Sequence, residues 1–442
     1  MRSVNKLVIP IIIAIVIVCA SNIQWGKNSW KDIIEADGKG YYAYLPAAFI
    51  YHDLNFSFFD SIEKKYPNPH IYYDYRIGEQ NKKADKYFAG TAVAMSPFFF
   101  IAHVSANCSG ADADGYSKIY PIMINVAAIF YLFIGLYYLK KLLKRYDASD
   151  NLTSFILVAI TFATNVFYYA VREPSMSHIY SFAFITMFIY YLHLFFASPK
   201  AKTILIISVL FGIIVLIRPV NGLIILIAPF VAGNKNTLTS GIDFLKKHIF
   251  ESMMGTLLFF SIVFIQLLIY KIQTGHYFID SYGAEKFNWN DPHPINFLIS
   301  YKKGLFVYTP LAFIGLLGLY KLFKQNKFQF FSLTIFLLVL LYVLSSWWNW
   351  WYGGSFSSRV CVEYYAILAL LICFAYKALK SKWSRNSYSA LIVCFLIVCQ
   401  IQTYQYRYYI IHWDMMDKTH YWNVFLRVDQ LGKENPNADL LK

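Results

Sequence analysis

Four short polar stretches interrupt an otherwise apolar sequence, and each carries side chains that can hold charge or hydrogen-bond a ligand. The first holds the acids Glu35 and Asp37, and the others, at 172–178, 218–221 and 347–363, combine arginine with acid, histidine or asparagine. Charged groups at membrane depth are costly and normally face a cavity or a partner. If the four stretches meet in space, a carboxylate and several arginines share one site.

The composition places these stretches in a membrane protein. The chain has 442 residues, of which 58% are hydrophobic and 15% are charged, whereas soluble proteins average about 45–50% and about 25%. Apolar runs of about 15 to 22 residues recur along the chain, as helices that span a bilayer require. The runs lack the alternating pattern of a transmembrane barrel. We therefore predict an all-α polytopic membrane protein.

The formal net charge of +15 does not indicate a nucleic-acid partner, because the basic residues cluster in short loops between the apolar runs. Such loops lie on the cytoplasmic side by the positive-inside rule. Eleven spans satisfy this rule, near 7–22, 118–139, 152–171, 177–196, 203–217, 220–232, 249–270, 304–323, 328–346, 360–379 and 387–405. The N-terminus is then cytoplasmic, and the long loops 23–117 and 271–303 lie outside.

Three segments leave the topology open. If the apolar run 90–106 crossed the bilayer, every later basic loop would change sides, so we expect a helix that lies in the outer interface or dips partway. The segments 203–217 and 220–232 are short, and they form either a re-entrant hairpin or two short spans. We predict one transmembrane domain, 1–405, followed by a short outer tail, 406–442.

An outward-facing cavity of this composition suits an anionic amphiphile such as a lipid-linked phosphate. Arginine and lysine neutralise the phosphate, tyrosine and tryptophan lie along a sugar or an isoprenoid chain, and the bilayer holds the lipid tail. If a sugar is transferred from such a donor, the leaving group is a stabilised phosphate anion that needs no general acid. One carboxylate then suffices as the base, and in-line displacement inverts the sugar.

Six segments resemble those of a known superfamily. In chain order they read DGKGYYAYLPAAFIYHDLNF, DKYFAGTAVAMSPFF, REPSMSHIYSF, LIRPVN, KKGLFVYTPLAFIGLLGL and WWNWWYGGSFSSRVCVEYY. Together they resemble bacterial members of the C-type (GT-C) glycosyltransferase superfamily, including the dolichyl-phosphate-mannose and aminoarabinose transferases. The resemblance implies a GT-C-like helical bundle in a bacterial inner membrane, with interface helices in the first periplasmic loop and a polyprenyl-phosphate sugar as donor.

The resemblance also implies roles for individual residues. An acid just after the first span is the catalytic base of this superfamily, and Asp37 matches it best, with Glu35 as the alternative. Lys86 matches a lysine that contacts the donor phosphate. With the polar stretches, the predicted site comprises Asp37 and Glu35 as catalytic residues; Lys86, Arg218, Arg359 and Arg172 on the donor phosphate; and Tyr41, Tyr42, His178, Glu363 and Trp350 on the substrate.

Several of these residues also have a purely structural explanation. Asp37 suits the N-cap of an interface helix that begins near Gly40, and Lys86 suits a lysine that snorkels beside a span. Arg359 and Glu363, four residues apart, suit a helical ion pair. Tyrosine and tryptophan at the ends of spans commonly anchor a protein in the membrane interface.

We expect no required metal and no cofactor. Glu35 and Asp37 have the spacing of the Asp-x-Asp-like metal ligands of oligosaccharyl transferases in the superfamily, but no partner carboxylates are apparent, so a divalent cation is the less favoured alternative. The histidines, His70 among them, lack the paired helical spacing of a zinc site. The sequence shows neither a Walker motif nor a Rossmann glycine fingerprint. The expected partners are a polyprenyl-phosphate-linked sugar, a lipid or glycan acceptor and the bilayer.

The leading hypothesis is an inverting glycosyltransferase that acts on the periplasmic face. One rival is a transporter or flippase of lipid-linked saccharides, which would show pseudo-symmetric halves and helices broken at the midplane. A second rival is a glycan ligase or polymerase, which need not place an essential acid directly after the first span.

Overall fold

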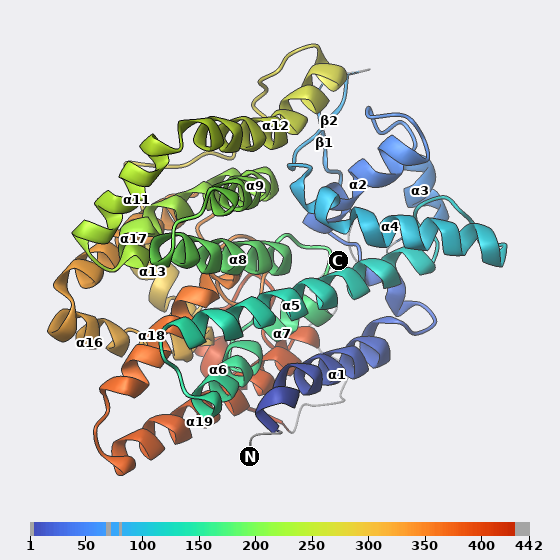
Figure 1. Ribbon diagram of the computed structural model, residues 1–442. Helices are drawn as coiled ribbons and strands as arrows, with labels where there is room; N and C mark the ends of the chain where they lie inside the picture. Colours follow the sequence, from blue (N-terminus) through green and yellow to red (C-terminus); the bar gives the residue numbers. More distant parts are fainter. Residues whose placement is uncertain (1–3, 68–71, 79–81, 429–442) are drawn as a thin grey trace.

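The computed structural model describes residues 4–67, 72–78 and 82–428, and the described chain is mainly helical (Figure 1). Its first half comprises α1 (Val4–Gln24), the 3-10 helix η1 (Ser29–Asp32), α2 (Asp37–Phe49), α3 (Phe59–Lys65), β1 (Arg76–Ile77), β2 (Ala84–Asp85), α4 (Gly90–Ser109), α5 (Ile119–Arg145), α6 (Asp150–Phe162), α7 (Val166–Val171), α8 (His178–Ala197) and α9 (Ala201–Ile217). The second half comprises η2 (Pro219–Ile227), α10 (Ala228–Ala232), α11 (Lys235–Lys247), α12 (Ile249–Thr274), α13 (Pro294–Ile299), α14 (Leu305–Tyr308), α15 (Pro310–Gly315), α16 (Leu317–Gln325), α17 (Lys327–Ser345), η3 (Arg359–Tyr364), α18 (Tyr365–Ala378), α19 (Lys382–Arg407) and α20 (Lys418–Val424). β1 and β2 pair as an antiparallel hairpin.

Eight helical segments of the described chain are long and apolar enough to cross a bilayer. They are α1 from Leu7, α4, α5, α8, α12, α17, η3 together with α18, and α19. The chain is therefore a multi-pass membrane protein. The other predicted spans are shorter or broken: α6 and α7 share one, α9 and the η2–α10 pair form two, and α14, α15 and α16 divide another. The total of eleven crossings stays a prediction.

The long helices pack side by side. In Figure 1, α12, α9, α8 and α5 follow one another down the view, and contacts join each of them to the next. Glycines permit the close approach: a Cβ atom on Gly135 of α5 would lie 2.5 Å from Phe182 of α8, and one on Gly255 of α12 would lie 2.6 Å from Ser208 of α9. Lipid tails are as apolar as the helices, so small residues of this kind are typical of helix contacts in membranes.

The four polar stretches meet at one end of the bundle, which we call the pocket end. Hydrogen bonds join Asp37 to Arg359 and both His178 and Arg218 to Glu363. The stretches lie where helices are interrupted. For example, α9 ends at Ile217 because the proline that follows Arg218 lacks an amide hydrogen and disfavours the helical conformation in the residue before it. Arg218 is accordingly extended, with φ −152° and ψ 116°.

The segment between α1 and α5 covers the pocket end, where α2, α3, the hairpin and α4 lie together on the right of Figure 1. The Tyr131 hydroxyl of α5 donates to Ala94 O of α4 at 3.0 Å, and His103 of α4 bonds to Tyr120 of α5 at 2.7 Å. These contacts lie in the first half of α5, so α4 runs beside the half of that helix nearer the pocket end. Whether α4 crosses the bilayer, as its length and composition allow, or lies at the interface stays open.

The described part of the predicted tail packs against the bundle. The Gln405 side chain donates to Val424 O at 2.6 Å, and the Tyr421 ring lies 5.6 Å from the Tyr308 ring, edge to face. Residues 429–442 lie outside the described range. α19 ends at Arg407, two residues after the predicted boundary, and the division into a transmembrane domain and a tail stays a prediction.

Candidate functional site

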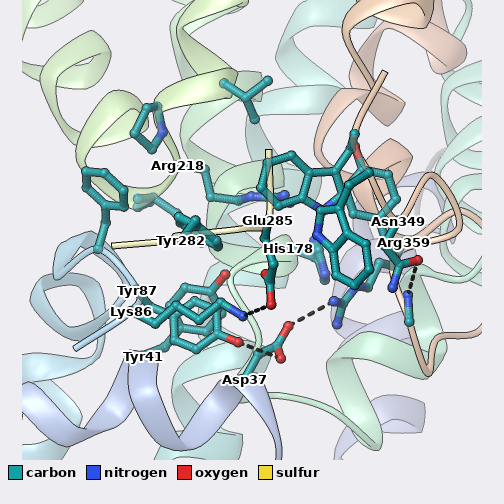
Figure 2. A pocket seen from close by; sticks show the side chains of 18 of the residues that line it. Asp37, Tyr41, Lys86, Tyr87, His178, Arg218, Tyr282, Glu285, Asn349 and Arg359 are labelled. Carbon is teal, nitrogen blue, oxygen red and sulfur yellow. Dashed lines mark hydrogen bonds and ion pairs between the residues drawn. The ribbon is translucent and has the colours of Figure 1, made fainter. Parts of the chain in front are cut away.

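A cavity of about 400 Å³ opens at the pocket end (Figure 2). Its polar lining consists of Asp37, Lys86, His178, Arg218, Glu285, Asn349 and Arg359, and its aromatic lining of Tyr41, Tyr73, Tyr87, Phe88, Tyr282, Phe287, Trp347, Trp348 and Tyr352. Six of the predicted site residues are among them: Asp37, Tyr41, Lys86, His178, Arg218 and Arg359. The cavity therefore combines an acid from the first loop with cations from distant helices.

An apolar groove adjoins this cavity. Pro219, Val220 and Phe287 line both, and the groove continues along Ile225 and Leu226 of η2. These two side chains are 42% and 45% exposed, although they belong to an apolar segment at membrane depth. The polar cavity thus opens on one side onto a surface that suits a hydrocarbon chain.

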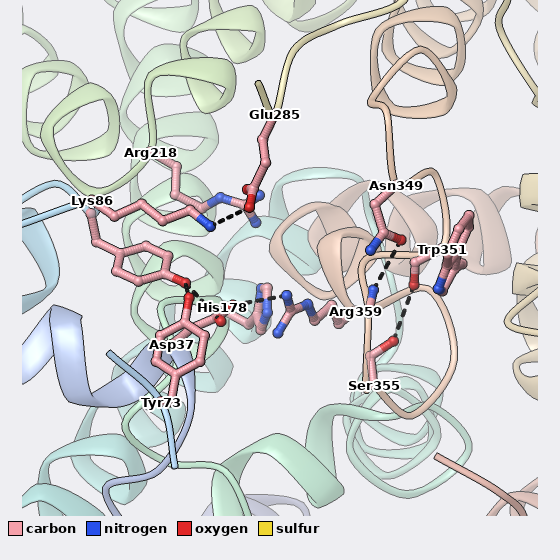
Figure 3. A network of polar contacts seen from close by, with 12 residues as sticks. Asp37, Tyr73, Lys86, His178, Arg218, Glu285, Asn349, Trp351, Ser355 and Arg359 are labelled. Carbon is pink, nitrogen blue, oxygen red and sulfur yellow. Dashed lines mark hydrogen bonds and ion pairs between the residues drawn. The ribbon is translucent and has the colours of Figure 1, made fainter. Parts of the chain in front are cut away.

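Asp37 is the first residue of α2 and lines the cavity. Its Oδ1 accepts a hydrogen bond from the Tyr87 hydroxyl at 2.7 Å, and its Oδ2 accepts one from Arg359 Nη2 at 2.8 Å. The Tyr87 hydroxyl is bonded in turn to the Tyr73 hydroxyl (Figure 3). Burial alone would raise the pKa of Asp37, but Arg359, Tyr87 and Lys86 together hold that pKa below its ordinary value. Asp37 is therefore ionised at neutral pH.

The start of α2 explains how Asp37 is positioned. The N-cap alternative for Asp37 is wrong, because α2 begins at Asp37 itself, earlier than predicted, and the cap position is Ala36, which makes no side-chain capping bond. Ala36 has φ 47° and ψ −131°, a strained conformation for a residue other than glycine. A Cβ atom on Gly38 would lie 2.0 Å from Ser175 Oγ, so glycine is needed for the loop before α8 to lie against α2. Strain and close packing therefore hold the carboxylate in place.

Lys86 follows β2 and lies within the cavity rather than along a span. Its ammonium forms an ion pair of 2.6 Å with Glu285, and it lies over the rings of Tyr87 and Tyr282 at 5.8 and 5.4 Å from their centres. Its side chain is 17% exposed. The structure therefore does not support the snorkelling alternative for this lysine.

Arg218 and His178 share one buried carboxylate. Arg218 Nη1 donates to Glu363 Oε1 at 2.6 Å, and His178 Nδ1 lies 3.0 Å from the same oxygen. The Glu363 side chain is 1% exposed, and its second oxygen has no hydrogen-bond partner among the described residues. The predicted helical pair of Arg359 with Glu363 is wrong, because Arg359 binds Asp37 instead. η3 is a 3-10 helix with about three residues per turn, so positions four apart in it do not share a face.

Five predicted site residues do not line the cavity: Glu35, Arg172, Tyr42, Trp350 and Glu363, the last of which is buried against Arg218 and His178. Tyr42 follows Tyr41 on α2 and points about 100° away from it around the helix, where its hydroxyl donates to Gly115 O. Arg172 donates to Gln24 Oε1 at 2.8 Å, and the Trp350 ring packs edge-on against Trp351. Burial raises the pKa of Glu35 to about 7. The geometry therefore favours Asp37 over Glu35 as the residue that meets a substrate.

Several lining residues were absent from the prediction: Tyr73, Tyr87, Tyr282, Glu285, Trp347 and Asn349. Tyr87 and Asn349 could have been predicted from the sequence, because Tyr87 follows Lys86 and Asn349 lies in the last polar stretch. Tyr282 and Glu285 lie in the long loop between α12 and α13. That loop shows no spacing that singles out either residue.

A metal site has no obvious place in the described part of the chain. Its residues include no group of three or more histidine, cysteine or acidic side chains that could hold a metal ion. His70 lies outside the described range. The expectation that no metal is required stays a prediction.

Comparisons with known proteins found similarity to solved structures but not to any family model or curated protein. No protein-family model and no curated protein matches the sequence. The chain is similar to the archaeal oligosaccharyltransferase AglB from Archaeoglobus fulgidus, in complex with an inhibitory peptide and a dolichol-phosphate, at 11% identity and a TM-score of 0.49. It is also similar to the apo oligosaccharyltransferase of Archaeoglobus fulgidus, at 11% identity and a TM-score of 0.47. Each comparison covers 96% of this chain but 60% of the other, and similarity at this level assigns no activity.

Proposed function

We propose that the chain is an inverting glycosyltransferase that moves a sugar from a polyprenyl-phosphate donor to a lipid or glycan acceptor. The observation that carries this proposal is the arrangement of Asp37 in one cavity with Lys86, Arg218 and Arg359, next to an apolar groove. A carboxylate that faces cations beside an apolar surface suits a ligand that is a phosphate at one end and a hydrocarbon at the other. The pocket end then faces the periplasm of a bacterial inner membrane.

The donor fits this arrangement in one orientation. Its phosphate lies among the cations of the cavity, and its isoprenoid chain leaves past Pro219 and Val220 into the groove along Ile225 and Leu226. The rings of Tyr41 and Tyr282 line the same cavity and are proposed to border the sugar. The membrane holds the remainder of the lipid, so the protein needs to enclose only the reacting end.

The reaction then needs one base. Asp37 accepts the proton of the acceptor hydroxyl, the hydroxyl oxygen forms a bond to the anomeric carbon, and the bond from that carbon to the phosphate oxygen breaks with its electrons on the phosphate. The cations stabilise the charge that develops there. A lowered pKa makes Asp37 a weak base, but it keeps the carboxylate ionised, and a phosphate leaving group compensates for weak proton abstraction.

Transfer by the purified protein tests the proposal. Proteoliposomes that contain the full chain are given a panel of undecaprenyl-phosphate sugars and candidate acceptors, and we expect release of undecaprenyl phosphate together with a glycosylated acceptor. Movement of an intact donor between leaflets without transfer would indicate the transporter instead. Transfer of an assembled glycan, with no use of single-sugar donors, would indicate the ligase or polymerase.

A native cysteine tests the proposed orientation. Cys108 is free and exposed, and it lies near the C-terminal end of α4, just before the loop that leads into α5. If the pocket end is periplasmic and α4 lies at the outer interface, as the sequence predicts, a membrane-impermeant maleimide added to intact spheroplasts labels the wild type and not the Cys108→Ser variant. Labelling of Cys108 only after the cells are opened would place the C-terminal end of α4 in the cytoplasm and contradict this arrangement.

A further inference from the structure

Each cation of the cavity already has a carboxylate partner. Lys86 pairs with Glu285 at 2.6 Å, Arg218 with Glu363 at 2.6 Å and Arg359 with Asp37 at 2.8 Å. The Glu363 side chain is 1% exposed and that of Asp37 is 20% exposed, whereas that of Glu285 is 32% exposed. A ligand phosphate that takes a cation from its partner would therefore displace Glu285 most easily.

Glu285 has room to leave Lys86 while its backbone stays in place. The loop around it is tied to the segment after α17, since Trp348 N donates to Lys286 O at 3.0 Å and Asn288 N donates to Ser346 O at 2.6 Å. The Lys86–Glu285 ion pair (Figure 3) lines both the first cavity and a second cavity of about 700 Å³. Rotation of the Glu285 side chain towards this second cavity would free the ammonium of Lys86.

The chemistry of the proposed function makes such a competing carboxylate useful, and the inference rests on that function. The donor is a phosphodiester with one negative charge, whereas the lipid phosphate that remains after transfer is a monoester with a charge of about −1.5 to −2 at neutral pH. A site with unopposed cations would therefore hold the product more tightly than the donor. Slow product release limits the turnover of many enzymes.

We propose that Glu285 is a product-release residue, whose carboxylate gives up Lys86 to the donor phosphate and reclaims it from the lipid phosphate after transfer. Glu285 thus weakens the binding of both lipids, and it weakens the binding of the product more because the product carries more charge. Its side chain reaches the ammonium of Lys86, not the reacting carbon. Glu285 therefore acts on release and not on the chemical step.

Lipid binding tests this role without knowledge of the natural sugar. The full-length protein in nanodiscs is titrated with undecaprenyl phosphate, with undecaprenyl-phosphate glucose as the diester of the same lipid, and with inorganic phosphate. For Glu285→Gln we expect the Kd of undecaprenyl phosphate to fall about three- to tenfold, the change that loss of one partly exposed opposing charge produces. The Kd of the diester should fall less. Inorganic phosphate should bind much more weakly, because it lacks the lipid chain.

A matched control removes another carboxylate at the same end of the molecule. Glu63 pairs with Lys39 at 2.7 Å and is 18% exposed, but it does not line the cavity. Glu63→Gln should leave both lipid affinities unchanged. Glu285→Ala serves as a second variant, and a wild-type thermal unfolding temperature shows that each variant is folded.

The outcomes separate this inference from the proposed function. Unchanged or weaker binding of undecaprenyl phosphate by folded Glu285→Gln and Glu285→Ala, beside clear binding by the wild type, would overturn the role of Glu285 and leave the transferase proposal standing. If the wild type binds neither lipid, both the role of Glu285 and the proposed transferase function are wrong.

Discussion

Replacement of Arg218 by methionine tests how the buried acid of the site is held. Arg218→Met keeps the length of the side chain but leaves Glu363, which is 1% exposed, without its guanidinium partner. Removal of one member of a buried ion pair costs about 3–5 kcal/mol. Because Arg218 is itself 19% exposed and His178 still faces the acid, we expect a loss near the lower limit, about 3 kcal/mol.

A double variant separates stability from ligand binding. Arg218→Met combined with Glu363→Gln removes the unpaired charge as well, so most of the lost stability should return, to within about 1 kcal/mol of the wild type. Thermal and denaturant unfolding of the purified proteins in detergent measure the first effect. Undecaprenyl phosphate affinity measures the second, and it should stay reduced about tenfold in both variants, because the cation is absent from both.

The reasoning is refuted if the double variant is no more stable than Arg218→Met, since the buried charge of Glu363 would then not be the cause of the instability. It is equally refuted if the stabilised double variant binds undecaprenyl phosphate as the wild type does. In that case Arg218 would serve only to neutralise Glu363.

Two further substitutions test how Asp37 is held. Tyr87→Phe removes a hydrogen-bond donor to Asp37, so the pKa of Asp37 should rise by about one unit. The acid limb of the pH profile of the transfer rate should move to higher pH by the same amount. The control Tyr282→Phe should leave the acid limb in place. Gly38→Ala puts a methyl group into Ser175, so transfer should fall at least tenfold with a lower unfolding temperature. Gly26→Ala is the control and should change neither, because a Cβ atom on Gly26 would meet only Ser29 Oγ, at an ordinary contact distance of 3.7 Å. An unmoved acid limb, or an active Gly38→Ala, would contradict these assignments.

The class of the protein could be predicted because hydrophobicity averaged over a span reports contact with lipid. Spans as long as α5, α8 and α12 have no other explanation. The internal breaks of the predicted span 304–323 were harder to predict. The segment 304–323 reads as one apolar run, but it is divided into α14, α15 and α16. Proline at residue 310 indicates one of these breaks, whereas the break before α16 has no such residue.

The meeting of the polar stretches could also be predicted, because charge at membrane depth needs partners. Which charged residue pairs with which could not be predicted. The rule for positions four apart assumes an α-helix, and η3 is a 3-10 helix, so Arg359 and Glu363 take different partners. Those partners, Asp37 and Arg218, lie far away in the chain. Glu285 was missed for the same reason, since it meets Lys86 only through the packing of the loop that follows α12.

The central claim is that Asp37 takes the proton of the acceptor, and the single-turnover transfer rate of Asp37→Asn tests it most directly. Asparagine has nearly the shape of aspartate and still meets Tyr87 and Arg359, but it cannot accept the proton. We expect this variant to be folded and to bind undecaprenyl phosphate, with a lower unfolding temperature because Arg359 loses its charged partner, and to transfer sugar about 10²–10⁴ times more slowly. Transfer at the wild-type rate by folded Asp37→Asn would contradict the account.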